Sequence, residues 1–318
     1  MNEQGVVTRT LAFLNRHASP LLAGALFVGL FVPPLAAALR PLFAPSVVVL
    51  LAVTMLRIDW GRTMAALAAW PLPALAIAAW LLVGAPVGVA AIIAALGLGE
   101  PLATIAVLMA SSPPLIAVSA FALMVGLDAG LVLVVTVATT LVLPLVQPPL
   151  LLWLLGLDLP VSLAALMGRL GLFVGSATGM AIAIRVAAGP ERVRRWHEPF
   201  GGVAVLSLIV FGIAVMDGLA AEVAAAPMTA LRYLVAVFAA NWGLQAAGAL
   251  VFWPAGRGVA LIAAMVGGNR NLAILAAVLA DQAPVGLFLW LALGQFPMYL
   301  FPAVLGGLYR RLLKRELE

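Results

Sequence analysis

Long runs of apolar residues, separated by short polar breaks, fill almost the whole chain. A helix that crosses the hydrocarbon core of a bilayer needs about 20 consecutive, predominantly apolar residues. The apolar segments are approximately 20–39, 43–57, 64–83, 86–110, 115–126, 128–155, 160–187, 200–217, 228–253, 256–281 and 284–309. Because 65% of the 318 residues are hydrophobic and only 9% are charged, the sequence predicts an all-α membrane protein with a single transmembrane domain over residues 1–318.

The distribution of Lys and Arg predicts the number of spans and their orientation. Joining the pieces on either side of residues 111–114, with the fourth helix starting near Pro101, gives ten spans. Cytoplasmic loops of membrane proteins carry an excess of basic residues. Thirteen of the 17 basic residues then fall on one side, which predicts a multi-pass protein of the cell (inner) membrane with both termini in the cytoplasm. These thirteen are Arg9, Arg16, Arg57, Arg62, Arg185, Arg192, Arg194, Arg195, Arg257, Arg310, Arg311, Lys314 and Arg315, against Arg40 and Arg232 outside.

The two halves of the chain resemble each other around the fourth and ninth spans. Residues 101–131 and 257–287 each run from an apolar half-helix through small or helix-breaking residues to a second half-helix, an Asp and the next helix. Five spans separate the two copies, so they cross the membrane in opposite directions. The sequence predicts two inverted five-helix repeats, at about 20–155 and about 160–312.

Helix-breaking residues interrupt both of these spans at membrane depth. The fourth contains SSPP at 111–114, and the ninth contains GGNRN at 267–271. The interrupting residues are Pro113, Pro114, Gly267 and Gly268. Proline lacks a backbone N–H and glycine is a poor helix former. Since exposed backbone is tolerated in hydrocarbon only inside protein or beside a watery cavity, we expect the breaks to cross near the midplane.

Arg270 lies inside the second break, where a charged side chain costs about 3 kcal/mol or more and needs acceptors. Two interpretations remain open at this point. The proline and glycine residues can serve helix packing alone, with Arg270 in a purely structural role. Alternatively, the ends of the half-helices and Arg270 together form a binding site.

Three further polar side chains are predicted at membrane depth. Arg169 lies about one third into the sixth span, where it either binds an anion or is a snorkelling or paired structural residue. Asn241 and Gln245 share one face of the eighth span. They either bond neighbouring helices or line a cavity.

Three stretches carry a family resemblance. MASSPPLIAVSAFALMVGLDAGLVLVVTVATTLVLPLVQPPLLLWLLG (109–156), GGNRN (267–271) and MLRIDW (55–60) are similar to the broken fourth helix with its following helix, the ninth-helix motif and the turn after the second helix of one family. This family is the bile acid:sodium symporter family, including its bacterial homologues, and the resemblance covers nearly the whole chain. It implies a core of helices three to five and eight to ten, whose broken members cross, and a panel of helices one, two, six and seven.

The chain departs from this family at the sodium ligands. The corresponding positions carry Leu81, Val118, Ser119, Val132, Thr136, Val266 and Arg270. Valine and leucine side chains offer no oxygen to a cation. The resemblance therefore implies a retained fold without the sodium sites, in which the guanidinium of Arg270 replaces bound Na⁺ and donates to the free carbonyls of the breaks.

From these features we expect a sodium-independent secondary transporter of a small organic anion. The alternative is a membrane receptor or assembly subunit of the same fold that transports nothing. A metalloid exporter of related fold is disfavoured, because such carriers use a Cys in the broken fourth helix and the chain has none. We expect no enzymatic activity, cofactor, metal or nucleic acid, and only the lipid bilayer and the anion as partners. The candidate substrate-binding residues are Ser111, Ser112, Ser119, Thr136, Arg169, Asn241, Gln245, Asn269, Arg270 and Asn271.

Overall fold

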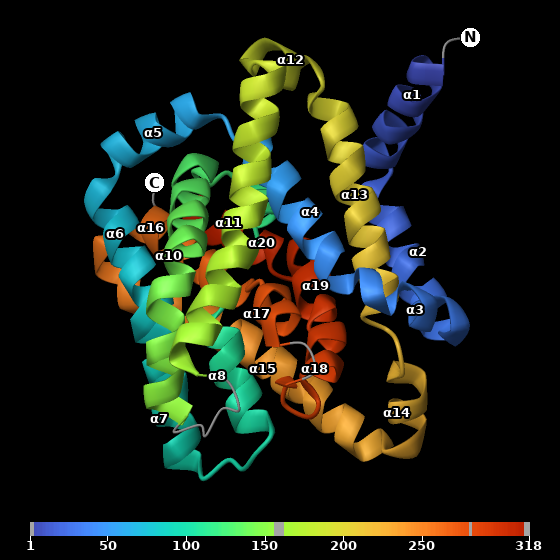
Figure 1. The fold of residues 1–318 in the computed structure, drawn as a ribbon. Helices are drawn as coiled ribbons and strands as arrows, with labels where there is room; N and C mark the ends of the chain where they lie inside the picture. The colour runs from blue at the N-terminus through green and yellow to red at the C-terminus, as the bar shows by residue number, and fades with distance from the viewer. Residues whose placement is uncertain (1–2, 156–161, 280–281, 315–318) are drawn as a thin grey trace. The chain divides into compact units, whose positions relative to one another are not determined.

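The computed structural model describes residues 3–155, 162–279 and 282–314, and this part of the chain consists of helices and connecting turns (Figure 1). Six helical stretches are long and apolar enough to cross a membrane, namely Pro33–Leu56, Pro71–Leu96, Ala129–Leu155, Leu163–Ala188, His197–Ala225 and Pro227–Ala255. Three shorter apolar helices are Leu102–Ser111, Arg257–Gly268 and Leu287–Met298. Large apolar side chains such as Leu72 (76% exposed) and Leu250 (75%) lie on the outer faces, as lipid contact requires. The chain is an all-α membrane protein.

The helices form two compact units. Unit 1 comprises Met1–Ile58 and Gly171–Ala230, and unit 2 comprises Asp59–Leu170 and Leu231–Glu318. Each unit therefore takes one segment from each half of the chain. The first turns of the sixth expected span, with Arg169, belong to unit 2, and the panel and core that the family resemblance implies stay predictions. The single domain and the two inverted repeats stay predictions.

Unit 1 is built around one central helix, α13 (His197–Ala214), which contacts α1, α2, α3 and α4. The glycines of α13 permit this packing, since a Cβ at Gly202 would lie 2.1 Å from the carbonyl oxygen of Leu11. The other helices of the unit are α1 (Glu3–Arg16), α2 (Ala18–Phe31), α3 (Pro33–Leu39), α4 (Phe43–Leu56), α12 (Pro190–Arg195), α14 (Leu219–Ala225) and most of α11 (Leu163–Ala188). Figure 1 shows α3 joining α2 to α4.

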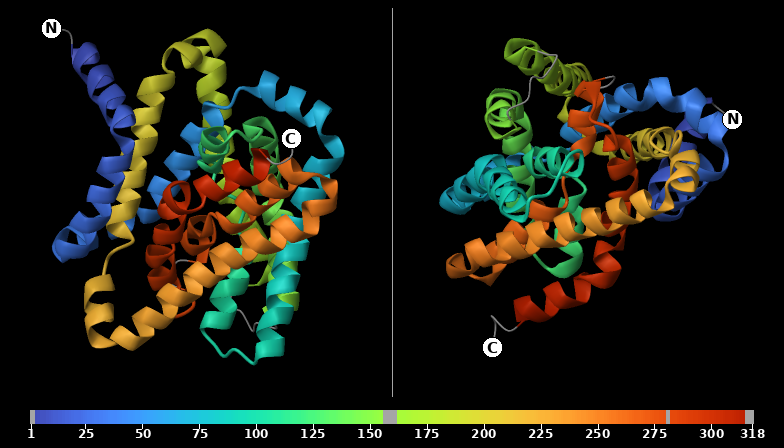
Figure 2. Two further views of the ribbon diagram at one scale, coloured as in Figure 1. Left: turned by 180° about the vertical axis from the view of Figure 1, so that it is seen from behind. Right: turned by 90° about the horizontal axis from the view of Figure 1, so that it is seen from below.

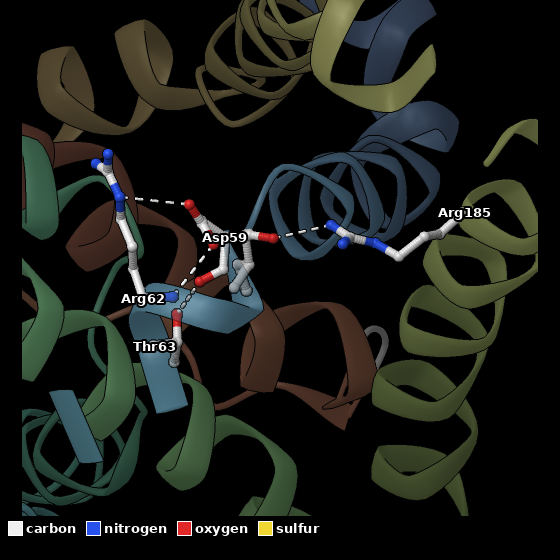
Figure 3. A network of polar contacts seen from close by, with 5 residues as sticks. Asp59, Arg62, Thr63 and Arg185 are labelled. Carbon is white, nitrogen blue, oxygen red and sulfur yellow. Dashed lines mark hydrogen bonds and ion pairs between the residues drawn. The ribbon is translucent and has the colours of Figure 1, made fainter. Parts of the chain in front are cut away.

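Arg185, near the end of α11, caps the end of α4. Its Nη2 donates to the carbonyl oxygens of Leu56 and Ile58, the second at 2.8 Å, and Figure 3 shows the guanidinium pointing at this backbone. The last carbonyls of a helix have no partner within it, and a cation there also complements the helix dipole. The bond fixes α11 to α4 inside unit 1.

Unit 2 begins with a capped surface helix, α5 (Trp60–Ala69). The carboxylate of Asp59 accepts a bond from the backbone N–H of Arg62 at 3.2 Å, and the hydroxyl of Thr63 donates to the Asp59 carbonyl oxygen at 2.8 Å (Figure 3). The remaining helices are α6 (Pro71–Ala79), α7 (Ala85–Leu96), α8 (Leu102–Ser111), α9 (Val118–Val125), α10 (Ala129–Leu155), α15 (Pro227–Phe252), α16 (Arg257–Gly268), α17 (Leu272–Leu279), α18 (Leu287–Leu293), α19 (Gln295–Val304) and α20 (Gly306–Lys314). Figure 2 shows α15 as one long unbroken helix.

Two expected segment boundaries are wrong. Pro86 does not separate two helices, as the segments 64–83 and 86–110 implied. Instead, α5 is a separate helix, and a single helical stretch runs from Pro71 through Pro86 to Leu96. A turn of π type over Trp80–Gly84 accommodates the proline. The last segment, 284–309, is divided into α18, α19 and the start of α20 rather than forming one helix.

Candidate functional site

Both expected breaks are present, and they pair with each other. Helix α8 ends at Ser111 and α9 begins at Val118, while α16 ends at Gly268 and α17 begins at Leu272. An isolated antiparallel β-bridge joins Pro114 to Arg270. We call the paired segments 112–117 and 269–271 the crossover.

The register of this bridge suits a proline. The backbone N–H of Asn271 donates to the Pro113 carbonyl at 2.7 Å, and that of Leu115 donates to the Asn269 carbonyl at 2.9 Å. In an antiparallel pair, alternate residue pairs exchange no hydrogen bonds of their own. Pro114 occupies such a position opposite Arg270, so its missing N–H leaves no acceptor unpaired.

Gly267 and Gly268 do not break the helix, in contrast to what the sequence suggested. They form the last turn of α16, and the interruption begins at Asn269. Their role is close packing against α15: a Cβ at Gly268 would lie 2.4 Å from the carbonyl oxygen of Asn241, and one at Gly267 would lie 3.0 Å from that of Leu244. Glycine is therefore required here by the approach of a neighbouring backbone.

Arg270 donates to the ends of both interrupted helices. Its side chain is 2% exposed. The Nε atom donates to the carbonyl of Gly267 at 2.7 Å, at the end of α16, and Nη1 donates to that of Ser112 at 2.9 Å, just beyond α8. The carbonyl ends of two helices each carry about half a negative charge. One guanidinium thus offsets both ends and ties α8 to α16.

A third contact links Arg270 to the π turn in front of Pro86. Because Pro86 has no N–H, the carbonyls of Leu81 and Leu82 lack their usual donors. Nη1 of Arg270 lies 3.5 Å from the Leu81 oxygen, and Nε2 of Gln147 donates to the Leu82 oxygen at 2.9 Å. The sequence pattern did not single out Gln147, although a buried Gln three helices from a mid-span proline is a signal that can be sought.

A directional chain of hydrogen bonds supports the other side of the crossover. The hydroxyl of Tyr309 donates to Oε1 of Gln245 at 2.7 Å, Nε2 of Gln245 donates to Oδ1 of Asn241 at 2.7 Å, and Nδ2 of Asn241 donates to the Gly268 carbonyl at 2.8 Å. All three side chains are buried. Asn241 and Gln245 thus form the interhelical bonds that are one of their two expected roles, and their role in substrate binding stays a prediction. Tyr309 was not predicted, because nothing in the sequence indicates that α20 reaches α15.

The positions that the family resemblance gives to sodium ligands are apolar and tightly packed. Leu81, Val118, Val132 and Val266 are each at most 1% exposed and belong to one buried hydrophobic cluster. The two hydroxyls that remain are bonded to backbone carbonyls three or four residues earlier. Ser119 donates to Ile116 and Thr136 donates to Val132, both at 2.8 Å.

The other predicted polar residues lie at or next to the crossover, where some of their side-chain atoms are hydrogen-bonded and others are not. Ser112 Oγ donates to the Leu108 carbonyl at 2.9 Å, and Asn269 Nδ2 donates to that of Met265 at 2.9 Å. Ser111 Oγ, Asn269 Oδ1 and Arg270 Nη2 are buried without a hydrogen-bond partner among the described residues. The crossover therefore retains polar atoms that its own structure does not use.

Arg169 lies on the exposed face of α11 within unit 2. Its expected place on a panel that faces the crossover stays a prediction. Nη1 of Arg169 donates to Oε1 of Gln282 at 3.2 Å. Gln282 also lines a small cavity of about 20 Å³, together with Leu108, Leu151, Leu166, Leu275, Leu279 and Pro284.

Side chains from both interrupted helices line this cavity. Leu108 lies one helical turn before the break that ends α8, and Leu275 lies one turn after the break that precedes α17. The wall of the cavity is thus apolar. Comparisons of the chain with protein-family models and with curated proteins found no match.

Proposed function

We propose that this protein is a secondary transporter of a small organic anion that works without sodium, with Arg270 in place of a bound cation at the crossover. The observation that supports it most is the bonding of Arg270, which donates to the carbonyl ends of two interrupted helices at 2.7 and 2.9 Å. Broken helices with charged partners at the membrane midplane are typical of substrate and ion sites in secondary transporters. We further propose the ten spans, the inverted repeats and the cytoplasmic termini described from the sequence.

A permanent guanidinium suits this role because it need not be loaded. A bound cation leaves the site when its concentration falls, whereas Arg270 stays charged at every physiological pH. The apolar packing of Leu81, Val118, Val132 and Val266 leaves the side chains of these positions without oxygen ligands. The crossover is thus held together in every step of a transport cycle, and its stability does not depend on Na⁺.

Arg169 supplies a charge for the anion. It is exposed, and among the contacts described for it the partner is the neutral Gln282. Gln282 also lines the small cavity, whose other lining side chains are apolar. A cationic group close to apolar surface suits an organic acid.

Flux into proteoliposomes tests this function. The purified protein is reconstituted, and uptake is measured for radiolabelled organic acids that include a bile acid, a short monocarboxylate and a dicarboxylate, with Na⁺, K⁺ or choline as the only cation. We expect saturable uptake of at least one acid, equal in the three cations. Saturable binding without uptake would instead favour a receptor or assembly subunit, and uptake that requires Na⁺ would contradict the proposed role of Arg270.

A further inference from the structure

We propose that the unused edge of Arg270, with the hydroxyl of Ser111, binds a single monovalent anion at the crossover. Nη2 of Arg270 and Oγ of Ser111 are both buried, and neither has a hydrogen-bond partner among the described residues. Arg270 is 2% exposed and Ser111 is 1% exposed. A buried donor without an acceptor costs about 1–3 kcal/mol, so such groups indicate a ligand or ordered water.

The two donors belong to the same small region. Nη1 of the same guanidinium bonds the carbonyl of Ser112, the neighbour of Ser111, at 2.9 Å. The hydroxyl of Ser112 is already bonded to the Leu108 carbonyl at 2.9 Å. Ser111, one residue before this bonded carbonyl, therefore carries the hydroxyl that has no partner among the described residues.

The charge at the crossover favours an anion over a neutral ligand. Two helices end there and two begin there, and each helix end carries about half a unit of dipole charge. The guanidinium offsets the two carbonyl ends, so the two N-terminal ends leave about one unit of positive charge at the crossover. The four ion pairs among the described residues are Arg16–Glu198, Arg40–Asp217, Arg62–Asp59 and Arg194–Glu191, and Arg270 takes part in none of them.

The net charge at the crossover predicts the charge of the ligand. One negative charge neutralises the crossover, whereas two would leave an uncompensated negative charge in a buried apolar site. The ligand chemistry is thus that of a halide or of one carboxylate group. Three other buried atoms of unit 2 also have no hydrogen-bond partner among the described residues, namely Trp80 Nε1, Gln147 Oε1 and Asn269 Oδ1. Ordered water alone at all of these atoms is the competing explanation.

This proposal deepens the proposed function, because it specifies the charge of the group that binds at the crossover. It rests on the proposed transport function only if the bound anion is the carboxylate of the transported substrate. Anion binding is therefore measured separately from flux. The midpoint of thermal unfolding of the purified protein is followed in chloride, bromide or acetate at constant ionic strength, with sulfate as the balancing anion. We expect saturable stabilisation by the three small monovalent anions and none by sulfate alone.

Two variants separate this site from a general salt effect. Ser111→Ala removes a hydroxyl that has no protein partner, so the variant should fold, and it should weaken the apparent affinity for chloride about tenfold, the change that about 1.4 kcal/mol gives. Ser207→Ala removes a buried hydroxyl bonded to the Val203 carbonyl in unit 1 and should leave that affinity unchanged. Equal affinities in the wild type and Ser111→Ala would overturn the site, as would the absence of any anion effect, which would mean water only.

A crystal grown in bromide gives the position directly. Anomalous scattering should place bromide within hydrogen-bond distance of Nη2 of Arg270, and bromide found only elsewhere would overturn the inference. Competition between chloride and the transported acid would identify the substrate carboxylate as the natural source, and its absence would identify a separate inorganic ion. Anion binding without uptake of any acid tested would support this site and contradict the transport function. Uptake without anion binding would contradict this site alone.

Discussion

Replacing Arg270 by Met tests whether the guanidinium holds the crossover together. Methionine keeps an unbranched apolar stem of similar reach but removes all five donors. The carbonyls of Gly267 and Ser112 then lose donors at 2.7 and 2.9 Å inside a buried site. The 3.5 Å contact with the carbonyl of Leu81 is too long to add much.

The expected loss follows from these two carbonyls. Each buried group left without a partner costs about 1–3 kcal/mol, so Arg270→Met should lower the free energy of unfolding by about 2–6 kcal/mol. Removing a buried charge also raises the free energy of unfolding, because the desolvation cost of that charge disappears. A net loss of stability would therefore show that the two hydrogen bonds outweigh this cost. Arg270→Gln, which retains one amide donor group, should lose about half as much.

Unfolding by sodium dodecyl sulfate in mixed micelles, followed by circular dichroism, measures this free energy. The matched control is Arg62→Gln, which removes a guanidinium that is 90% exposed and 3.5 Å from the carboxylate of Asp59; its effect should stay within about 0.5 kcal/mol. If Arg270→Met is as stable as the control variant or the wild type, the guanidinium does not hold the two helix ends and the reasoning is wrong.

Three other predictions concern different parts of the chain. Tyr309→Phe should lower the free energy of unfolding by about 1–2 kcal/mol, because the side-chain Oε1 of Gln245 loses its donor at 2.7 Å. A double-mutant cycle with Asn241→Ala should show a coupling energy of at least about 0.5 kcal/mol. Additive effects would mean that the chain of bonds is not continuous. Arg169→Gln should raise the dissociation constant of a transported acid about tenfold without lowering the unfolding midpoint, since the side chain is exposed; an unchanged constant would remove Arg169 from the site. A single Cys at position 194 of this Cys-free chain should react with a membrane-impermeant maleimide only after the cytoplasmic face is opened, and labelling of intact cells would refute the orientation.

The breaks could be predicted from the sequence because their causes are local. Two consecutive prolines, Pro113 and Pro114, remove two neighbouring backbone donors, and an arginine at membrane depth needs carbonyl acceptors. Both effects act over a few residues, so the positions of the breaks can be predicted. The two breaks are expected to meet because unpaired backbone must be shielded from lipid. The bonds from Arg270 to Gly267 and Ser112 agree with that reasoning.

The features that could not be predicted depend on neighbours distant in the sequence. Gly268 looked like a helix breaker, but its conformation is helical and its small size is required by the backbone of Asn241. Pro86 looked like a boundary, but a π turn and the side chain of Gln147 allow the helix to continue past it. Tyr309 is polar only at its tip, and its role depends on the packing of α20, which hydropathy does not encode.

The melting temperature of the wild-type protein in different cations tests the replacement of sodium by Arg270 most directly. The purified protein is unfolded in equal concentrations of sodium, potassium and choline gluconate, so that only the cation changes. If Arg270 takes the place of bound Na⁺, the three midpoints should agree within the error of the measurement. A saturable rise of the midpoint in Na⁺ alone would contradict this replacement, because it would show that a cation site persists among oxygen atoms beside the guanidinium.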